Sequence, residues 1–250
     1  MQVNCTFAAR PPKPEPIASW KHLAGFIAIM AALLVLGLYQ QGAGGGSGAG
    51  SNQGSGQLAS HSHAIPIYLT ALAMDWALLY FCWAGVHRHG DNLWHLAGGR
   101  WTSWRDVISD LAVMLPFWAV WEGAAYGVHL LLGSGSAKTV DSLLPQSLAE
   151  VLVWIATCIT AGICEEMAFR GYLQRQFHAL TGKLAWAILL QALVFGIAHG
   201  YQGWRNVVVI SVLGVLYGAL AAWRKNLRAN MIAHAWSDVW EGWLKFVVRR

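Results

Sequence analysis

Long apolar runs constrain the fold of this chain more than any other feature of its sequence. They cover residues 22–39, 64–86, 107–132, 148–169, 185–200, 207–223 and 230–248. Most of these runs approach the length of about 20 residues that a helix needs to cross a membrane. Only 12% of all residues are charged, against about 25% in an average soluble domain, and the mean hydropathy is +0.42. We therefore predict an all-α polytopic transmembrane bundle of about seven spans, within a range of six to eight.

The basic residues orient these spans, because cytoplasmic loops of membrane proteins are enriched in lysine and arginine. With a cytoplasmic N-terminus, 12 of the 17 basic residues lie inside: Arg10, Lys13, Lys21, Arg88, Arg100, Arg105, Arg170, Arg175, Lys183, Arg224, Lys225 and Arg228. The other five are Lys138, Arg205, Lys245, Arg249 and Arg250, so the C-terminal end fits this orientation least well. We expect an integral protein of the plasma or inner membrane whose partner is membrane lipid. The net charge of +5 then needs no nucleic acid to explain it.

Composition divides the chain into four regions. Residues 1–41 form a cytoplasmic N-terminus and a first anchor helix, and residues 42–63 contain a Gly/Ser-rich stretch that is typical of a flexible external linker. Residues 64–142 hold spans without a recognisable motif, whereas residues 143–250 hold the clustered polar residues.

Small and sulfur-containing residues within the runs indicate packing. The GxxxG pairs Gly123–Gly127 and Gly214–Gly218 would let helix backbones approach closely. The four cysteines, Cys5, Cys82, Cys158 and Cys164, have no CxxC spacing, which favours apolar packing over metal or redox chemistry.

Charged or histidine side chains inside apolar runs are expensive and usually face a cavity or one another. Here they are Asp75, Asp110, Glu122, His129, Glu165, Glu166, His199, His234, Asp238 and Glu241. Taken singly, each of them fits a structural hydrogen bond as well as a catalytic role. Their spacing has to distinguish the two.

Two adjacent glutamates stand in the stretch "GICEEMAFRGYL", residues 162–173. On an α-helix, Glu166 and Arg170 are four residues apart with the acid nearer the N-terminus, the better order for an ion pair. Glu165 has Phe169 at the corresponding position and so lacks a local basic partner. We therefore predict an ion-paired, supporting Glu166 and a Glu165 that is available as a general base.

His199 and His234 are the histidines best placed to meet these acids. Glu165 and His199 each lie 17 residues from Gly182, the centre of a predicted hairpin, which places them at the same depth on neighbouring helices. Such a pair can activate a water molecule. His234 and Asp238 are four residues apart on one helical face, where a carboxylate can fix the tautomer of an oxyanion-stabilising histidine.

A zinc site is the alternative interpretation of the same residues. Glu165, His199 and His234 would supply a His2Glu ligand set. The HExxH signature of such sites is absent from the sequence, so we expect no metal and no other cofactor.

Three segments resemble the motifs of the CPBP family, the CAAX-type and bacteriocin-processing intramembrane endopeptidases also known as Abi or type II CAAX prenyl endopeptidases. "EEMAFRGYL" is similar to EExxxR, "FGIAH" (residues 195–199) to FxxxH, and "HAWSD" (residues 234–238) to Hxxx(N/D). They occur in the family's order, on separate predicted spans, within residues 145–240. The resemblance does not extend to residues 1–100.

This resemblance implies a role for each matching residue. Glu165 would activate water with His199 as its partner, His234 and Asp238 would serve the oxyanion side, and Glu166, Arg170 and Phe195 would support the site. Asp238 stands where prenyl-processing members often have asparagine. An ionised carboxylate donates no hydrogen bond, so Asp238 either orients His234 or is protonated.

The resulting prediction is an intramembrane endopeptidase that hydrolyses a peptide bond in a membrane-proximal, hydrophobic or lipidated peptide. Two other classes of protein remain open. A non-catalytic scaffold or bacteriocin self-immunity protein could keep these residues as a structural network. A proton-coupled transporter could also use them, together with Asp75 and Glu122, although the sequence has no inverted repeat.

Overall fold

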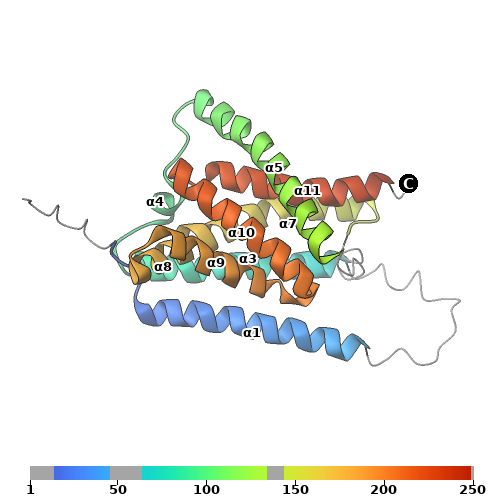
Figure 1. Ribbon diagram of the computed structural model, residues 1–250, viewed down its shortest axis with the longest axis horizontal. Helices are drawn as coiled ribbons and strands as arrows, with labels where there is room; N and C mark the ends of the chain where they lie inside the picture. Colours follow the sequence, from blue (N-terminus) through green and yellow to red (C-terminus); the bar gives the residue numbers. More distant parts are fainter. Residues whose placement is uncertain (1–13, 46–63, 134–143, 249–250) are drawn as a thin grey trace, which may run out of the picture.

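The computed structural model describes residues 14–45, 64–133 and 144–248 (Figure 1). In these ranges the chain is helical and contains no β-strand. Cys5, most of the predicted 42–63 linker and five of the basic residues used to orient the chain lie outside the described residues. The predicted all-α bundle is confirmed.

Seven long helical segments correspond to the seven apolar runs. They are α1 (Trp20–Gly45), α3 (Ala64–His87), α5 (Trp104–Leu132), the continuous segment of α7 (Leu148–Glu165), η2 (Glu166–Leu173) and α8 (Gln174–Thr181), then α9 (Leu184–Ala198), α10 (Trp204–Arg224) and α11 (Arg228–Val248). Two short helices, α4 (Leu93–Ala97) and η3 (Gly200–Gln202), lie in connections. Serine N-caps with capping boxes start α5 at Ser103 and α7 at Ser147.

Five helices in the described residues are long and apolar enough to cross a membrane, two fewer than the seven spans that the sequence predicts. The two that fall short are α9 and α11. Helix α9 has 15 residues, a rise of roughly 22 Å against a hydrocarbon core of about 30 Å. Helix α11 carries Asp238 and Glu241 among its apolar residues, and these polar positions belong to the region where the motifs meet.

The helices form one bundle in which α1 packs against α9 and η3, while α5 packs against α10 and α11. In Figure 1, α1 and α5 accordingly lie on opposite sides, with the motif-bearing helices between them. The apolar core is centred on η2, whose Phe169 and Tyr172 rings contact Phe26 of α1. The core therefore encloses the segment that carries Glu166 and Arg170 of the first motif.

One end of the bundle collects most of the basic residues, and we call it the basic end. Its connections are tied together by Arg175, which donates to the carbonyl groups of His95 and Leu96, and by a buried carboxylate, Asp110. Asp110 pairs with Arg224 at 2.7 Å and with Arg228 at 3.2 Å. Asp110 thus has a structural role. For each acidic residue within an apolar run, the sequence allowed either a structural or a catalytic role.

Close helix contacts depend on small residues, but only at some of the predicted positions. A Cβ on Gly214 would lie 2.8 Å from Ala192 Cα, so the Gly214–Gly218 pair does bring α9 and α10 together. A Cβ on Gly123 or Gly127 would have no heavy atom of another element within 4 Å, so the packing role predicted for that pair is wrong within the described residues. The described cysteines, Cys82, Cys158 and Cys164, are free and buried, as predicted.

Gly162 makes the closest approach between α7 and α11. A Cβ there would lie 2.8 Å from Met231 O and 2.9 Å from Ala235 N, both backbone atoms that cannot move aside without moving α11. We predict that Gly162→Ala lowers the free energy of unfolding by about 1–3 kcal/mol. Gly127→Ala in α5, where the space is open, is the matched control and should leave stability unchanged or slightly higher. Thermal unfolding of the purified variants in detergent measures both, and equal melting temperatures would contradict the packing role of Gly162.

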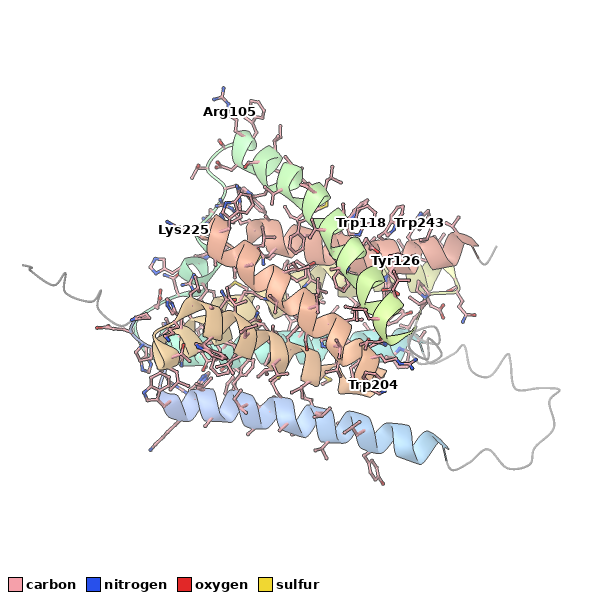
Figure 2. All side chains as sticks on the ribbon, viewed as in Figure 1. Arg105, Trp118, Tyr126, Trp204, Lys225 and Trp243 are labelled. Carbon is pink, nitrogen blue, oxygen red and sulfur yellow. The ribbon has the colours of Figure 1, made fainter. Side chains whose placement is uncertain are left out.

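The two ends of α10 test the orientation. Trp204 and Lys225 are exposed and lie at opposite ends of this helix (Figure 2). In a variant without native cysteines, an impermeant maleimide should label Trp204→Cys on intact cells, but Lys225→Cys only after permeabilisation. The reason is the accumulation of lysine and arginine at the Lys225 end. The opposite labelling pattern would reverse the orientation.

Candidate functional site

From Glu166 onward, the first motif lies in a π-helix rather than in the α-helix that the sequence predicts, and Glu165 is the last residue of α7. Residues Glu166–Leu173 form η2, which ends where the N–H of Gln174 donates to the carbonyl of Phe169, five residues earlier. All eight residues of η2 are buried. Wide helical turns of this kind are rare and frequently occur at functional sites. Here the wide turn begins at a buried carboxylate, Glu166, which has two hydrogen-bond partners on α11.

Glu166 is completely buried and has three polar partners. Arg170 Nη1 donates to Oε1 at 2.8 Å, and Asn230 Nδ2 donates to Oε2 at 3.1 Å. His234 Nδ1 lies 2.9 Å from Oε1. The predicted pairing of Glu166 with Arg170 is therefore confirmed, and two residues of α11 complete the set. A buried carboxylate needs such partners, because an unpaired one is strongly destabilising.

His234 is held by one ring nitrogen and presents the other to the site. Since Nδ1 faces Glu166, Nε2 is directed towards Asp238 Oδ2 at 3.6 Å and Glu165 Oε2 at 3.8 Å. The hydrogen bond that orients the imidazole thus comes from Glu166 and not, as the sequence suggested, from Asp238. Asp238 and Glu165 are left partly exposed, with 39% and 18% of their side-chain surface accessible.

Aromatic rings from two further helices complete the frame around Arg170 and His234. The Arg170 guanidinium lies 4.3 Å from the centre of the Phe195 ring and 5.1 Å from that of Tyr217. Tyr217 also stacks on His234, with ring centres 5.3 Å apart and planes inclined by 21°. The predicted supporting residues Arg170 and Phe195 therefore contact the site directly, and Tyr217 of α10 joins them.

His199 follows the last residue of α9 and packs against the Phe195 ring, which also contacts the His234 ring. The His199 ring is 4.9 Å from that of Phe195, and its Nδ1 lies 2.9 Å from the Phe195 carbonyl oxygen, which leaves Nε2 available. Its ring also faces Tyr201, on which Glu165 and Asp238 act electrostatically. Within the described chain, the imidazole within 4 Å of Glu165 is that of His234. The direct cooperation of Glu165 with His199 stays a prediction.

The sequence reasoning missed three residues of this region. Asn230 is four residues before His234, so the same periodicity that selected Asp238 also marks it. No sequence feature distinguishes Tyr217 or Tyr201 from other aromatic residues, because aromatic residues are common in membrane helices. The sequence presented Asp75 of α3 as an acid within an apolar run and as a candidate of the transporter alternative. In the structure, Glu165, His234 and Asp238 are the charged groups that act on it most strongly.

The ligand set proposed for zinc does not converge in this structure. Zinc requires nitrogen and oxygen ligands at about 2.0–2.2 Å from one point. His234 Nδ1 is taken by Glu166, its Nε2 is 3.8 Å from Glu165, and His199 lies beyond the Phe195 ring. In the described residues no three side chains of the usual ligand types come together to hold an ion. We therefore derive no step through a metal.

Comparison with known proteins gives one match. Residues 147–240 match the family model described as type II CAAX prenyl endopeptidase Rce1-like, whereas no curated protein and no solved structure matches the chain. The matched region begins at the N-cap of α7, ends within α11 and contains all three motifs. It leaves out α1, α3 and α5. The chain is thus an integral membrane protein with an Rce1-like domain at residues 147–240, which is consistent with the CPBP family that its three motifs resemble.

Proposed function

We propose that this protein is an intramembrane endopeptidase in which Glu165 activates a water molecule to hydrolyse a peptide bond. The observation that carries this proposal is the unequal environment of two adjacent glutamates. Glu166 is fully buried and bound by Arg170, Asn230 and His234, whereas Glu165 is partly exposed beside the free nitrogen of His234. Glu166 therefore holds the site together, and Glu165 is the carboxylate that can accept a proton.

His199 supports the water from the side opposite His234. The His199 ring stacks on that of Tyr201, Glu165 acts electrostatically on the same tyrosine, and Nε2 of His199 is free to hydrogen-bond a water that Glu165 also binds. When Glu165 removes the proton, the hydroxide attacks the carbonyl carbon of the peptide. The proton then passes from Glu165 to the leaving amine.

His234 is positioned to stabilise the oxyanion of the tetrahedral intermediate. Because Nδ1 donates to Glu166, the ring donates from Nε2 only as an imidazolium. Glu166 on one side of the ring, and Glu165 and Asp238 on the other, are the counter-charges that such a cation requires. Asp238 in its acid form would add a second donor to the oxyanion.

The substrate class follows from the location of the site. The reacting groups lie within a bundle of apolar helices, so the scissile bond has to reach the site from the membrane or from its surface. We propose a hydrophobic or lipidated peptide as substrate and membrane lipid as the surrounding partner. The enzyme would lie in the plasma or inner membrane with its N-terminus in the cytoplasm and would need no metal cofactor.

A pair of identical substitutions tests the division of roles between the glutamates. Glu165→Gln should reduce cleavage by at least about 100-fold, the usual contribution of a general base, while the amount of folded protein stays near wild type. Glu166→Gln should lower the amount of folded protein as well. It leaves the buried Arg170 without its counter-charge, a loss of about 3–5 kcal/mol. Size-exclusion chromatography measures folded protein, and mass spectrometry compares membrane peptides from cells that express each variant.

Two results would contradict this assignment. Equal losses of folded protein in both variants would remove the distinction between Glu165 and Glu166. Unchanged membrane peptides in cells with wild-type protein and with Glu165→Gln would favour the non-catalytic scaffold over the peptidase.

The role of metal is tested separately. We expect purified protein in detergent to contain substoichiometric zinc and to keep its activity after prolonged treatment with a strong chelator, because Glu165 and His199 need no ion to activate water. Metal analysis and peptidase assays before and after chelation give the answer. Stoichiometric zinc that is lost and restored together with activity would make Glu165, His199 and His234 ligands instead.

A further inference from the structure

A tyrosine in the connection between α9 and α10 borders the site but belongs to none of the three motifs. Tyr201 lies in η3, two residues after His199, the residue that ends the second motif. The proposed mechanism uses the ring of this tyrosine only as a neighbour of His199. Its hydroxyl group has no role in that mechanism.

The Tyr201 ring is fixed from two sides. It stacks on the His199 ring, with centres 6.1 Å apart and planes inclined by 29°. On the α1 side, a Cβ on Gly37 would lie 3.0 Å from Tyr201 Cβ, and a Cβ on Gly200 would overlap the Leu34 side chain. Helix α1 therefore packs directly against η3, which limits the positions that the Tyr201 side chain can take.

The hydroxyl group of Tyr201 accepts one hydrogen bond and keeps its proton free. Gln202 Nε2 donates to the Tyr201 oxygen at 3.0 Å. A phenol can accept and donate at the same time, and none of the described residues accepts a hydrogen bond from this one. Tyr201 is also partly exposed, whereas Tyr217, the tyrosine that stacks on His234, is completely buried. The Tyr201 proton is therefore available to a bound substrate.

The acids of the site are the charged groups that act on Tyr201. Glu165 does so most strongly, followed by Asp238 and Asp75. Glu165 and Asp238 are also the carboxylates towards which His234 Nε2 is directed, at 3.8 and 3.6 Å. Tyr201 and His234 thus have the same two carboxylates as neighbours, so both donors belong to the region in which a peptide bond would be hydrolysed.

An oxyanion that forms beside carboxylates needs hydrogen-bond donors that are in place before the reaction. His234 donates from Nε2 only as an imidazolium, and Asp238 donates only in its acid form. A tyrosine hydroxyl is protonated at neutral pH, because its ordinary pKa is about 10. Tyr201 can therefore supply a donor whatever the protonation state of the acids around it.

We propose that the Tyr201 hydroxyl donates a hydrogen bond to the carbonyl oxygen of the scissile peptide bond and is a further catalytic residue. This inference rests on the proposed peptidase function and adds to it a residue outside the family motifs. When the hydroxide bonds to the carbonyl carbon, an electron pair of the C=O bond moves to the oxygen, which then accepts from Tyr201 and His234. The pair returns when the C–N bond breaks, and Tyr201 keeps its proton throughout.

Tyr201→Phe tests the proposal, because phenylalanine keeps the ring between His199 and α1 and removes only the donor. The assayed substrate is a synthetic peptide that spans the cleavage site found by comparing membrane peptides from cells with wild-type protein and with Glu165→Gln. We expect kcat per folded protein to fall about 100-fold, the usual loss for one oxyanion donor, with KM nearly unchanged. The loss should be equally large across the pH profile, because the tyrosine hydroxyl does not titrate there.

Tyr126→Phe is the matched control. Tyr126 is 66% exposed on α5 (Figure 2), so this variant loses the same hydroxyl group and should keep the wild-type kcat. Size-exclusion chromatography gives the amount of folded protein to which each kcat refers.

Three results would overturn the role of Tyr201 alone: a wild-type kcat in Tyr201→Phe, an increase in KM without loss of kcat, or a loss that changes with pH. The second would place the hydroxyl in substrate binding, and the third would make it a group that acts on the titration of Glu165. If no membrane peptide differs between wild-type protein and Glu165→Gln, the peptidase function itself is wrong, and the role of Tyr201 is wrong with it.

Discussion

The structure depends on the burial of one carboxylate, Glu166, within apolar helices. An isolated carboxylate in such surroundings is unstable, so its neighbours have to supply hydrogen bonds and positive charge. Arg170 does so from the same segment, and Asn230 and His234 do so from α11. The requirement to satisfy one acid thus joins two segments separated by more than 60 residues and sets the orientation of the histidine between them.

Close backbone packing and the π-helix make this arrangement possible. Gly162 lets α7 approach α11 at Met231 and Ala235, immediately before the two glutamates and around His234. The motif is buried from Glu166 onward in the wide turn of η2, and the Arg170 guanidinium lies against the rings of Phe195 and Tyr217. A regular helix with larger residues at this contact would separate the carboxylates from α11. Packing and chemistry are therefore set by the same few positions.

The division between a buried acid and a partly exposed acid accounts for the chemistry that we propose. Glu166 cannot exchange protons freely, because its oxygens are occupied. Glu165, one residue earlier, faces His234 Nε2 and Asp238 and keeps access to a substrate. Asp75, on a helix outside the matched domain, adds a further carboxylate to the same region. Helix α3, which lies outside the family match, thus contributes to the electrostatics of the site.

The amino-acid sequence predicts the all-α bundle, the positions of its long helices and the residues of the three motifs. These properties follow from local information: the lengths of apolar runs, the spacing of charged residues and the order of short motifs. It also predicted the Glu166–Arg170 pair, since both partners lie in one helical turn.

The identity of the acid that orients His234 could not be predicted, because Glu166 and Asp238 are equally plausible until α7 and α11 are placed side by side. The π-helix, the roles of Tyr217 and Asn230, and the different environments of the two GxxxG pairs likewise depend on contacts between distant segments. Periodicity within one helix carries no information about such contacts.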